Sequence, residues 1–335
     1  MGMVDLLGVA RDLSKAPKGI FAADESPKSA DKRLASYGIA TGEEMRHKER
    51  DLFLATAGIE QYLTGVILHE ETLEQKAFDG TPFPELLATK GIMPGIKVDG
   101  GTEPMPESKD EVITSGLLGL SKRLHAYRDT HHTPFTTWRA VIRIEGDHLP
   151  TAENIVENAK RLAMSARCVQ EAGMVPILEP EVLYDGTHSR VRAREVIKET
   201  LGTLMKALDE HAVDCSGILI KSAMAMSGKD TGRIDTPEEV AEDTVEAFLA
   251  AVPREVPGII FLSGGQGNDQ ATDNLRAIAT YAKTKDAPWN LTFSYSRALQ
   301  DEALSIWQGK DENMEAARAA FLARLEKVAL AAEGK

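Results

Sequence analysis

A lysine within an apolar segment is the residue of this chain best suited to covalent chemistry. The segment 217–224 reads GILIKSAM and is typical of a buried β-strand that carries one ammonium group, Lys221. Because strand side chains alternate between faces, Lys221 shares one face with Leu219, opposite Ile220. Burial would lower the pKa of this amine, and the neutral form could attack a carbonyl group to form an imine. The alternative is a strand-end lysine that reaches solvent.

Two carboxylates lie at the end of another apolar segment. Glu179 and Glu181 flank Pro180 directly after the residues VPIL. On a strand, both side chains would lie on one face. Two carboxylates in one site tend to separate their pKa values, so that one can act as a general acid near neutral pH. A solvated loop after the strand is the alternative.

Groups that could bind phosphate follow two further apolar segments. Residues 263–265, Ser-Gly-Gly, could offer backbone amides to an anion. Arg297 follows the next segment and could bind a phosphate through two parallel hydrogen bonds, the alternative being a helix-start salt bridge. Lys97, within GIKVD, is a second lysine in an apolar segment. Its ammonium would either lower the pKa of Lys221 further or bind a substrate phosphate.

Eight apolar segments separated by helical ones must position these residues. The expected strands cover residues 19–24, 62–69, 92–98, 135–144, 174–183, 217–224, 258–262 and 291–295. The expected helices cover residues 4–14, 29–37, 43–56, 83–89, 116–128, 151–172, 191–211, 236–252, 273–284, 299–307 and 314–332. This alternation indicates parallel strands buried on both faces, and eight such units predict an α/β fold, the (β/α)8 or TIM barrel, with one domain over residues 1–335. A doubly wound sheet is the alternative, but the first turn reads AADES instead of a glycine-rich sequence.

The composition limits the classes of partner. The chain has 335 residues and a net charge of −13, without a basic tract, which gives no support for nucleic acid or an anionic membrane as a partner. Two distant cysteines, Cys168 and Cys215, predict neither a disulfide framework nor a CxxC metal site, and His131-His132 has no ligand at metal spacing nearby. We therefore expect no metal and no cofactor. No segment resembles a signal peptide or a membrane span, and we expect a cytoplasmic protein.

Seven motifs together resemble those of class I fructose-bisphosphate aldolase. They are AADES (22–26), HEETLEQK (69–76), GIKVD (95–99), VPILEPE (175–181), GILIK (217–221), FLSGGQ (261–266) and LTFSYSRAL (291–299), and the resemblance covers about residues 15–335. It implies a (β/α)8 barrel, often assembled as a homotetramer. It also implies an aldehyde-lyase of glycolysis and gluconeogenesis that reversibly cleaves fructose 1,6-bisphosphate into dihydroxyacetone phosphate and glyceraldehyde 3-phosphate, through a Schiff base and without metal.

The resemblance also assigns roles to matching residues. Lys221 matches the Schiff-base lysine, and Asp24 matches the aspartate that helps to deprotonate the C4 hydroxyl. Glu179 matches the acid and base of carbinolamine formation and dehydration, and Glu181 matches a glutamate that interacts with the lysine. The expected substrate contacts are Ser263, Gly264 and Arg297 for the 1-phosphate, Ser26, Ser29, Arg33 and Lys97 for the 6-phosphate, and Arg139 and Ser294.

Three positions depart from the family pattern. Thr137 stands before a Trp-Arg pair, where the family normally has a catalytic lysine. A lysine ammonium at this position would stabilise charge at the C4 oxygen. Its loss is expected to lower the cleavage rate by about 10²–10³. We therefore expect the imine to form, C–C cleavage to be slow, and Thr137→Lys to accelerate cleavage, although Arg139 or Arg143 on the same strand face could compensate in part. Ser296 replaces a glycine before the phosphate arginine, and the chain stops at Lys335, without the terminal tyrosine of the vertebrate enzymes.

Two other functions stay open because of Thr137. One is a Schiff-base aldolase of another ketose phosphate. The other is an inactive or impaired aldolase that binds phosphosugars. In each case the expected partners are a phosphorylated sugar and further copies of the chain, with a homotetramer favoured.

Overall fold

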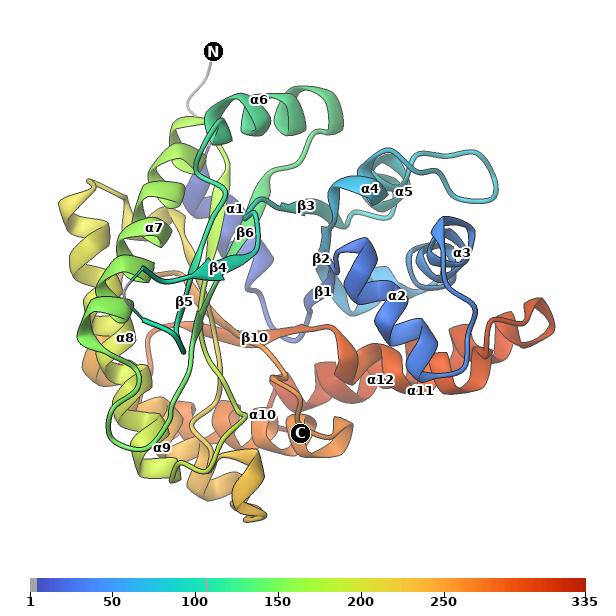
Figure 1. Cartoon of the computed structure of the whole chain (residues 1–335). Coiled ribbons are helices and arrows are strands. Elements are labelled where there is room, and N and C mark those ends of the chain that lie inside the picture. The colour runs from blue at the N-terminus through green and yellow to red at the C-terminus, as the bar shows by residue number, and fades with distance from the viewer. Residues whose placement is uncertain (1–4, 107) are drawn as a thin grey trace.

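Parallel strands close into a barrel at the centre of the molecule. The computed structural model describes residues 5–106 and 108–335. Within these residues, each of eight strands pairs in parallel with the next, and β1 also pairs with β10, which closes the barrel (Figure 1). The barrel strands are β1 (Gly19–Ala23), β2 (Leu63–Leu68), β3 (Met93–Lys97), β6 (Phe135–Ile142), β7 (Val175–Val182), β8 (Leu219–Ser222), β9 (Gly258–Phe261) and β10 (Asn290–Tyr295). The predicted (β/α)8 barrel is confirmed.

Helices surround the barrel and connect its strands. They are α1 (Leu6–Leu13), α2 (Pro27–Ser36), α3 (Glu43–Leu54), α4 (Glu70–Leu73), α5 (Phe83–Thr89), α6 (Leu120–His131), α7 (Ala152–Glu171), α8 (Arg190–Glu210), α9 (Pro237–Ala251), α10 (Asn268–Thr284), α11 (Arg297–Trp307) and α12 (Met314–Ala332). Several begin where their sequence signals predict. Thr236, for example, caps α9 in a reciprocal pair with Glu239, and Pro237 is the first helical residue. Among the described residues, no helix is both long enough and apolar enough to cross a bilayer.

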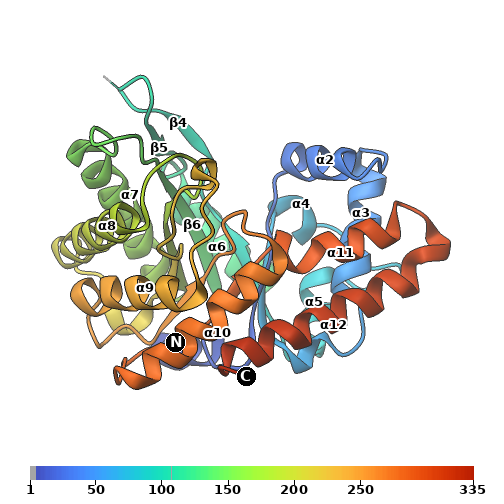
Figure 2. The same cartoon turned by 90° about the horizontal axis from the view of Figure 1, so that it is seen from below.

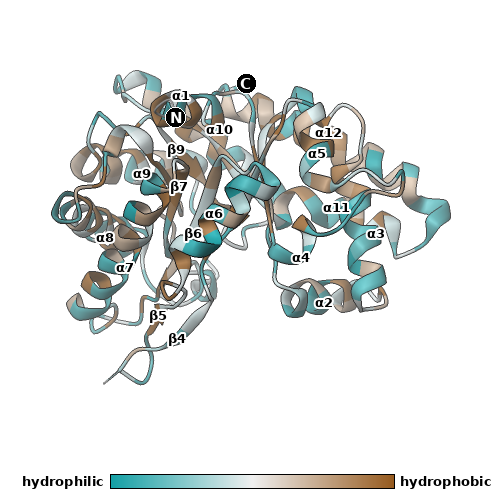
Figure 3. Cartoon of the chain, turned by 90° about the horizontal axis from the view of Figure 1, so that it is seen from above, coloured by the Kyte–Doolittle hydropathy of each residue, from teal (hydrophilic) through white to brown (hydrophobic). Residues whose placement is uncertain are grey.

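The amino-terminal helix closes one end of the barrel. Leu13 of α1 belongs to the same buried cluster as Ile20, Phe135 and Leu219, which point into the barrel. In β8, Ile220 belongs instead to the cluster outside the barrel, so the alternation expected for this strand is confirmed. Figure 3 colours much of β7 and β9 as hydrophobic, as expected for strands buried on both faces. Of the predicted helix 4–14, residue 4 lies outside the described residues.

The two ends of the chain meet on one side of the barrel. Helices α2 and α3 lie beside α11 and α12 in both views (Figures 1 and 2). The rings of Phe21, Phe53 and Phe321 join β1, α3 and α12, with centroids 4.8 to 5.6 Å apart. Aromatic rings at such separations pack favourably edge to face. The expected C-terminal helices therefore complete the same side of the molecule as the first helices after β1.

A short hairpin was not predicted from the sequence. Strands β4 (Thr102–Pro104) and β5 (Val112–Thr114) pair in antiparallel and project from the barrel (Figure 2). The buried carboxylate of Glu111 holds the hairpin against α7, accepting hydrogen bonds from the amide and the hydroxyl of Thr151 at 2.8 and 2.7 Å. Strands of three residues, one of them fully exposed, are too short to show a hydrophobic period, so no signal could have revealed them.

Gly95 makes room for the ring of Phe135 inside the barrel. A Cβ atom at Gly95 would lie 2.2 Å from that ring. We expect Gly95→Ala to lower the free energy of unfolding by about 1–3 kcal/mol, because overpacking displaces a buried side chain. Denaturant unfolding measures the effect. The matched control is Gly202→Ala in α8, where a Cβ atom meets nothing within 4 Å and should stabilise the helix by up to about 1 kcal/mol. Equal effects of the two substitutions would contradict the steric argument.

Candidate active site

A cavity of about 670 Å³ opens at the carboxyl ends of the barrel strands, where (β/α)8 enzymes have their active sites. Twelve of the residues singled out from the sequence line it. They are Asp24, Ser26, Ser29, Lys97, Arg139, Glu179, Glu181, Lys221, Ser263, Gly264, Ser294 and Arg297.

A buried ion pair lies in this cavity. Nζ of Lys221 is 3.0 Å from Oε2 of Glu179. The pairing of β7 with β8 explains the contact, because Ile177 lies opposite Leu219 and the next inward-facing residues of the two strands are Glu179 and Lys221. The two side chains are nearly inaccessible, with residue exposures of 5% and 4%. Each charge therefore depends on the other for stabilisation.

The carboxylates around Lys221 reverse the expected shift of its pKa. Burial alone lowers the pKa of this amine, but the carboxylates of Glu179 and Asp24 outweigh burial and raise it. The depressed pKa expected from the sequence is therefore wrong for the free protein. Burial also raises the pKa of Glu179, against the opposing effect of the Lys221 ammonium. The Glu179 carboxylate is thus the nearest group able to accept the proton that Lys221 must lose before it can attack a carbonyl group.

Glu181 has a different partner from the one that the sequence suggested. Its carboxylate accepts a hydrogen bond from Nε of Arg139 and forms an ion pair with that guanidinium. Burial opposes the charge on Arg139, but Glu181 and Glu179 raise its pKa. Glu181 therefore acts on Lys221 only through its charge, while Glu179 makes the direct contact.

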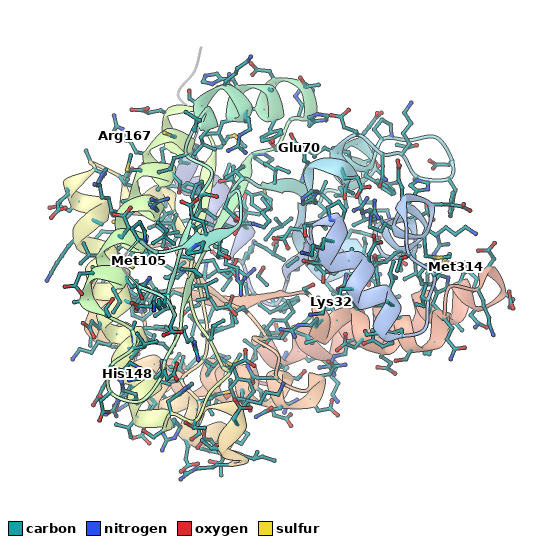
Figure 4. The ribbon with its side chains drawn as sticks, viewed as in Figure 1. Lys32, Glu70, Met105, His148, Arg167 and Met314 are labelled. Carbon is teal, nitrogen blue, oxygen red and sulfur yellow. The ribbon has the colours of Figure 1, made fainter. Side chains whose placement is uncertain are left out.

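Lys97 lies on strand β3, three strands from β8 around the barrel. Its ammonium donates a hydrogen bond to the carboxylate of Asp99, which is anchored in turn by the amides of Gly101 and Arg139 at 3.0 and 3.2 Å. Helix α6 also contributes side chains to the cavity lining. Tyr127 of α6 donates a hydrogen bond to Glu70 at 3.0 Å, and the Glu70 label in Figure 4 lies beside that helix.

The sequence reasoning missed the cavity residues of α6. Tyr127 and Arg123 line the cavity, although they come from the middle of a helix. Arg123 donates hydrogen bonds to the carbonyl groups of Val98 and Gly116 at 3.0 and 2.6 Å, which ties the loop after β3 to α6. A search of strand ends could not have found them, because only the packing of α6 against this loop brings them to the cavity.

The loop after β9 has backbone geometry typical of an anion site. Gly264 and Gly265 have φ angles of +60° and +92°, which turn successive backbone amides toward one side. Arg297, at the start of α11, lies against this loop, since a Cβ atom at Gly265 would be 3.3 Å from its Nη2 atom. The structure thus brings the Ser-Gly-Gly segment and Arg297 together, as the sequence predicts. Ser296 donates a hydrogen bond to Gln300 at 3.1 Å, within its own helix.

A second group of polar atoms lies at the start of α2. Ser26 caps this helix, its hydroxyl accepting a hydrogen bond from the amide of Ser29 at 3.3 Å. Both serines line the cavity. Arg33, expected beside them, is buried behind the cavity wall, where it forms ion pairs of 2.5 Å with both Glu25 and Glu49. Burial raises the pKa of Glu25 to about 7, although Arg33 opposes the shift.

Neither Thr137 of the fourth barrel strand nor Arg143, just after the end of that strand, lines the cavity. Thr137 is buried, does not line the cavity, and its hydroxyl has no hydrogen-bond partner among the described residues. Arg143 lies beyond the end of β6 and forms an ion pair with Glu145 at 2.7 Å. The expectation that Arg143 could compensate for Thr137 is therefore wrong, because the strand ends before the alternation reaches it.

Residues 5–106 and 108–335 contain no cluster of metal ligands and no disulfide. No group of three or more His, Cys, Asp or Glu side chains in these ranges is arranged to hold a metal ion. Cys168 and Cys215 are free thiols.

The ion pair with Glu179 should keep the pKa of Lys221 raised. We expect Glu179→Gln to lower the pKa of Lys221, because burial persists while the nearest negative charge is lost. Lys221 should then react with acetic anhydride at lower pH, as measured by mass spectrometry of the peptide across a pH series. Glu145→Gln, which removes a carboxylate paired with Arg143 outside the cavity, is the control. An unchanged or raised pKa in Glu179→Gln would show that Glu179 does not stabilise the ammonium.

Comparisons with known proteins agree on one family. A family model described as fructose-bisphosphate aldolase class-I matches residues 5–335. The chain is 44% identical to "Fructose-bisphosphate aldolase 6, cytosolic" of Arabidopsis thaliana, over 96% of this chain and 88% of that protein. It is 43% identical to "Fructose-bisphosphate aldolase, cytoplasmic isozyme" of Spinacia oleracea, over 99% of this chain and 91% of that protein.

A solved structure is similar over the same length. It is the fructose-bisphosphate aldolase of Plasmodium falciparum in a ternary crystal with TRAP and a small-molecule inhibitor. The TM-score is 0.95 at 40% sequence identity, and the match covers 98% of this chain and 94% of that one.

Proposed function

This chain belongs to the class I fructose-bisphosphate aldolase family, and on that premise we propose that it cleaves fructose 1,6-bisphosphate through an imine on Lys221. The products are dihydroxyacetone phosphate and glyceraldehyde 3-phosphate, and the reaction is reversible. The observation that carries this proposal is the buried pair of Lys221 and Glu179, 3.0 Å apart in a cavity that is also lined by Ser26, Ser29, Ser263 and Arg297.

Imine formation requires a proton to leave and return. In the proposed first step, Glu179 accepts a proton from Lys221, and the neutral amine adds to the C2 carbonyl group. A second proton passes from the nitrogen to the C2 oxygen, which gives a carbinolamine, and Glu179 then returns its proton to the C2 hydroxyl, which leaves as water. Burial raises the pKa of Glu179, which favours the protonated form that this donation requires. Glu181 holds Arg139 in place beside this centre.

The cleavage step breaks the C3–C4 bond. We propose that Asp24 accepts the proton of the C4 hydroxyl. The C4–O bond becomes the carbonyl group of the aldehyde, and the electron pair of the C3–C4 bond moves into the iminium to form an enamine. Protonation of the enamine carbon and hydrolysis of the imine then release the ketone product and restore Lys221.

Different groups of the cavity suit the two phosphates of the substrate. The amides after β9 together with Arg297 suit the 1-phosphate, because guanidinium and oriented amides both bind anions. Ser26 and Ser29, at the start of α2, suit the 6-phosphate. Arg33 stands behind them and would act through its ion pair with Glu25 rather than by touching the substrate.

A second candidate activity is the same chemistry on another ketose phosphate. Thr137 favours it, since a buried hydroxyl that does not line the cavity changes the charge available near the C4 end. Cleavage rates for fructose 1,6-bisphosphate and fructose 1-phosphate, measured side by side with other ketose phosphates, would decide between the candidates.

The assembly and location of the protein are also proposals. One buried core extends from Phe21 to Ala332, which supports a single domain over residues 1–335. The family resemblance favours assembly with further copies of the chain, as a homotetramer, in which exposed apolar residues such as Leu118 and Ile234 would be covered. We propose a cytoplasmic location because the relatives from Arabidopsis thaliana and Spinacia oleracea are named cytosolic or cytoplasmic.

Trapping of the imine tests the nucleophile. Borohydride reduction in the presence of dihydroxyacetone phosphate should add one adduct per chain, and peptide mass spectrometry should assign it to Lys221. Lys221→Met should abolish the adduct, whereas Lys122→Met, which removes an exposed lysine of α6, should not. An adduct on Lys97, or no adduct, would count decisively against the assignment.

A metal chelator tests whether the imine, and not a metal ion, withdraws electrons during cleavage. The protonated imine withdraws electrons from C3, which a divalent cation would otherwise have to do by polarising the carbonyl group. We therefore expect cleavage to continue unchanged after dialysis against EDTA. If EDTA abolished activity and zinc or cobalt restored it, the Schiff-base mechanism would be wrong.

A further inference from the structure

We propose that Lys97 stabilises the negative charge that develops on the C4 oxygen during cleavage, and that it does so because position 137 carries no charge. This inference rests on the proposed function and deepens it. It makes Lys97 a catalytic residue in this chain, in addition to any contact that it makes with the 6-phosphate.

The need for a cation follows from the chemistry of the step. An alcohol is a far weaker acid than a carboxylic acid, so a carboxylate such as Asp24 removes the C4 proton only while another group stabilises the oxygen. A preorganised positive group at such an oxygen is typically worth about 10²–10³ in rate. A cation near the C4 oxygen is therefore expected in an active site that cleaves at a measurable rate.

The cavity offers few candidates for that cation. Among the described residues, Lys97 and Lys221 are the only lysines that line it, and the nitrogen of Lys221 is committed to the imine. Arg139 and Arg123 carry guanidinium groups, which are poor proton donors at neutral pH. The first is paired with Glu181, and the second donates hydrogen bonds to the carbonyl groups of Val98 and Gly116. Arg297 lies against the loop after β9, where the 1-phosphate is proposed to bind. Lys97 is the remaining ammonium group.

The strand register explains why Lys97 can take this position. Lys97 of β3 lies directly opposite Thr137 of β6, and both are inward-facing positions of the barrel wall. A lysine at position 137 would extend into the same region of the cavity, and the two ammonium groups would repel each other. With threonine there, buried and not lining the cavity, the space above it is left to Lys97.

The contact with Asp99 orients Lys97. The Asp99 carboxylate holds its ammonium and is itself fixed by the amides of Gly101 and Arg139. On the other side is His69, whose pKa is lowered by burial and by the nearby charges of Arg50 and Lys97, while Asp24 opposes the shift. Asp24, His69 and Lys97 all line the same cavity. The proposed proton acceptor and the proposed cation thus face one enclosed space.

The test separates the C4 oxygen from the 6-phosphate. Lys97→Gln removes the charge but keeps a donor for Asp99, and Lys97→Arg keeps the charge. Single-turnover cleavage of fructose 1-phosphate, which has no 6-phosphate, should fall about 10²–10³-fold in Lys97→Gln and much less in Lys97→Arg. Borohydride trapping of dihydroxyacetone phosphate on Lys221 should proceed at an unchanged rate in both variants, which also shows that they are folded.

A double-mutant cycle with Thr137→Lys completes the test. In the Lys97→Gln background, Thr137→Lys should recover most of the lost cleavage rate. In the unmodified protein it should add less than about tenfold, in contrast to the acceleration expected from the sequence alone, because the oxygen already has its cation. Lys122→Met is the control for loss of a lysine outside the cavity and should leave cleavage unchanged.

Three outcomes would overturn the inference. One is a loss in Lys97→Gln that is confined to substrates with a 6-phosphate, which would make Lys97 a phosphate ligand only. Another is an equal effect of Thr137→Lys in both backgrounds. The third is a parallel loss of imine formation and cleavage in Lys97→Gln. Failure of trapping on Lys221 in the unmodified protein would instead refute the proposed function itself.

Discussion

The ion pair between Lys221 and Glu179 is the interaction on which the rest of this site depends. Two charges removed from water cost several kcal/mol each unless they are held in good geometry, on the order of what a whole domain has as net stability. The closed barrel meets this requirement, because the pairing of β7 with β8 brings the two side chains to 3.0 Å without relying on a mobile loop. The same enclosure keeps water away, so the pair can exchange one proton between nitrogen and oxygen.

The two ends of the barrel interior differ in composition and in role. Toward the amino ends of the strands, the ring of Phe135 fills the space left by Gly95, and Leu13 of α1 closes the opening. Toward the carboxyl ends, the inward positions carry charges such as Lys221 and Glu179. The apolar part provides the stability that the charged part lacks, and it leaves polar groups only where a cavity of about 670 Å³ admits a ligand.

The local charge of the cavity differs from that of the whole protein. The chain has a net charge of −13, yet Arg297 lies against the loop after β9 at the cavity. Short-range hydrogen bonds and ion pairs to a phosphate act within a few ångströms, whereas surface charges farther than about 8–10 Å away are largely screened at physiological salt. An acidic protein can therefore hold a doubly phosphorylated substrate, provided that its cations are close to each phosphate.

The sequence alone determined the barrel, the order of its strands and about half of the residues that line the cavity. Those features depend on local periods: apolar runs separated by helical segments, and alternation that puts Lys221 on the inner face of its strand. Only the tertiary structure decided which groups meet. The raised pKa of Lys221 comes from carboxylates on β7 and after β1, and Arg33 turns to Glu25 and Glu49 behind the wall. Tyr127 reaches the cavity from a helix, and Thr137 lies opposite Lys97. Each of these is set by a contact between segments distant in sequence, and no local pattern records such a contact.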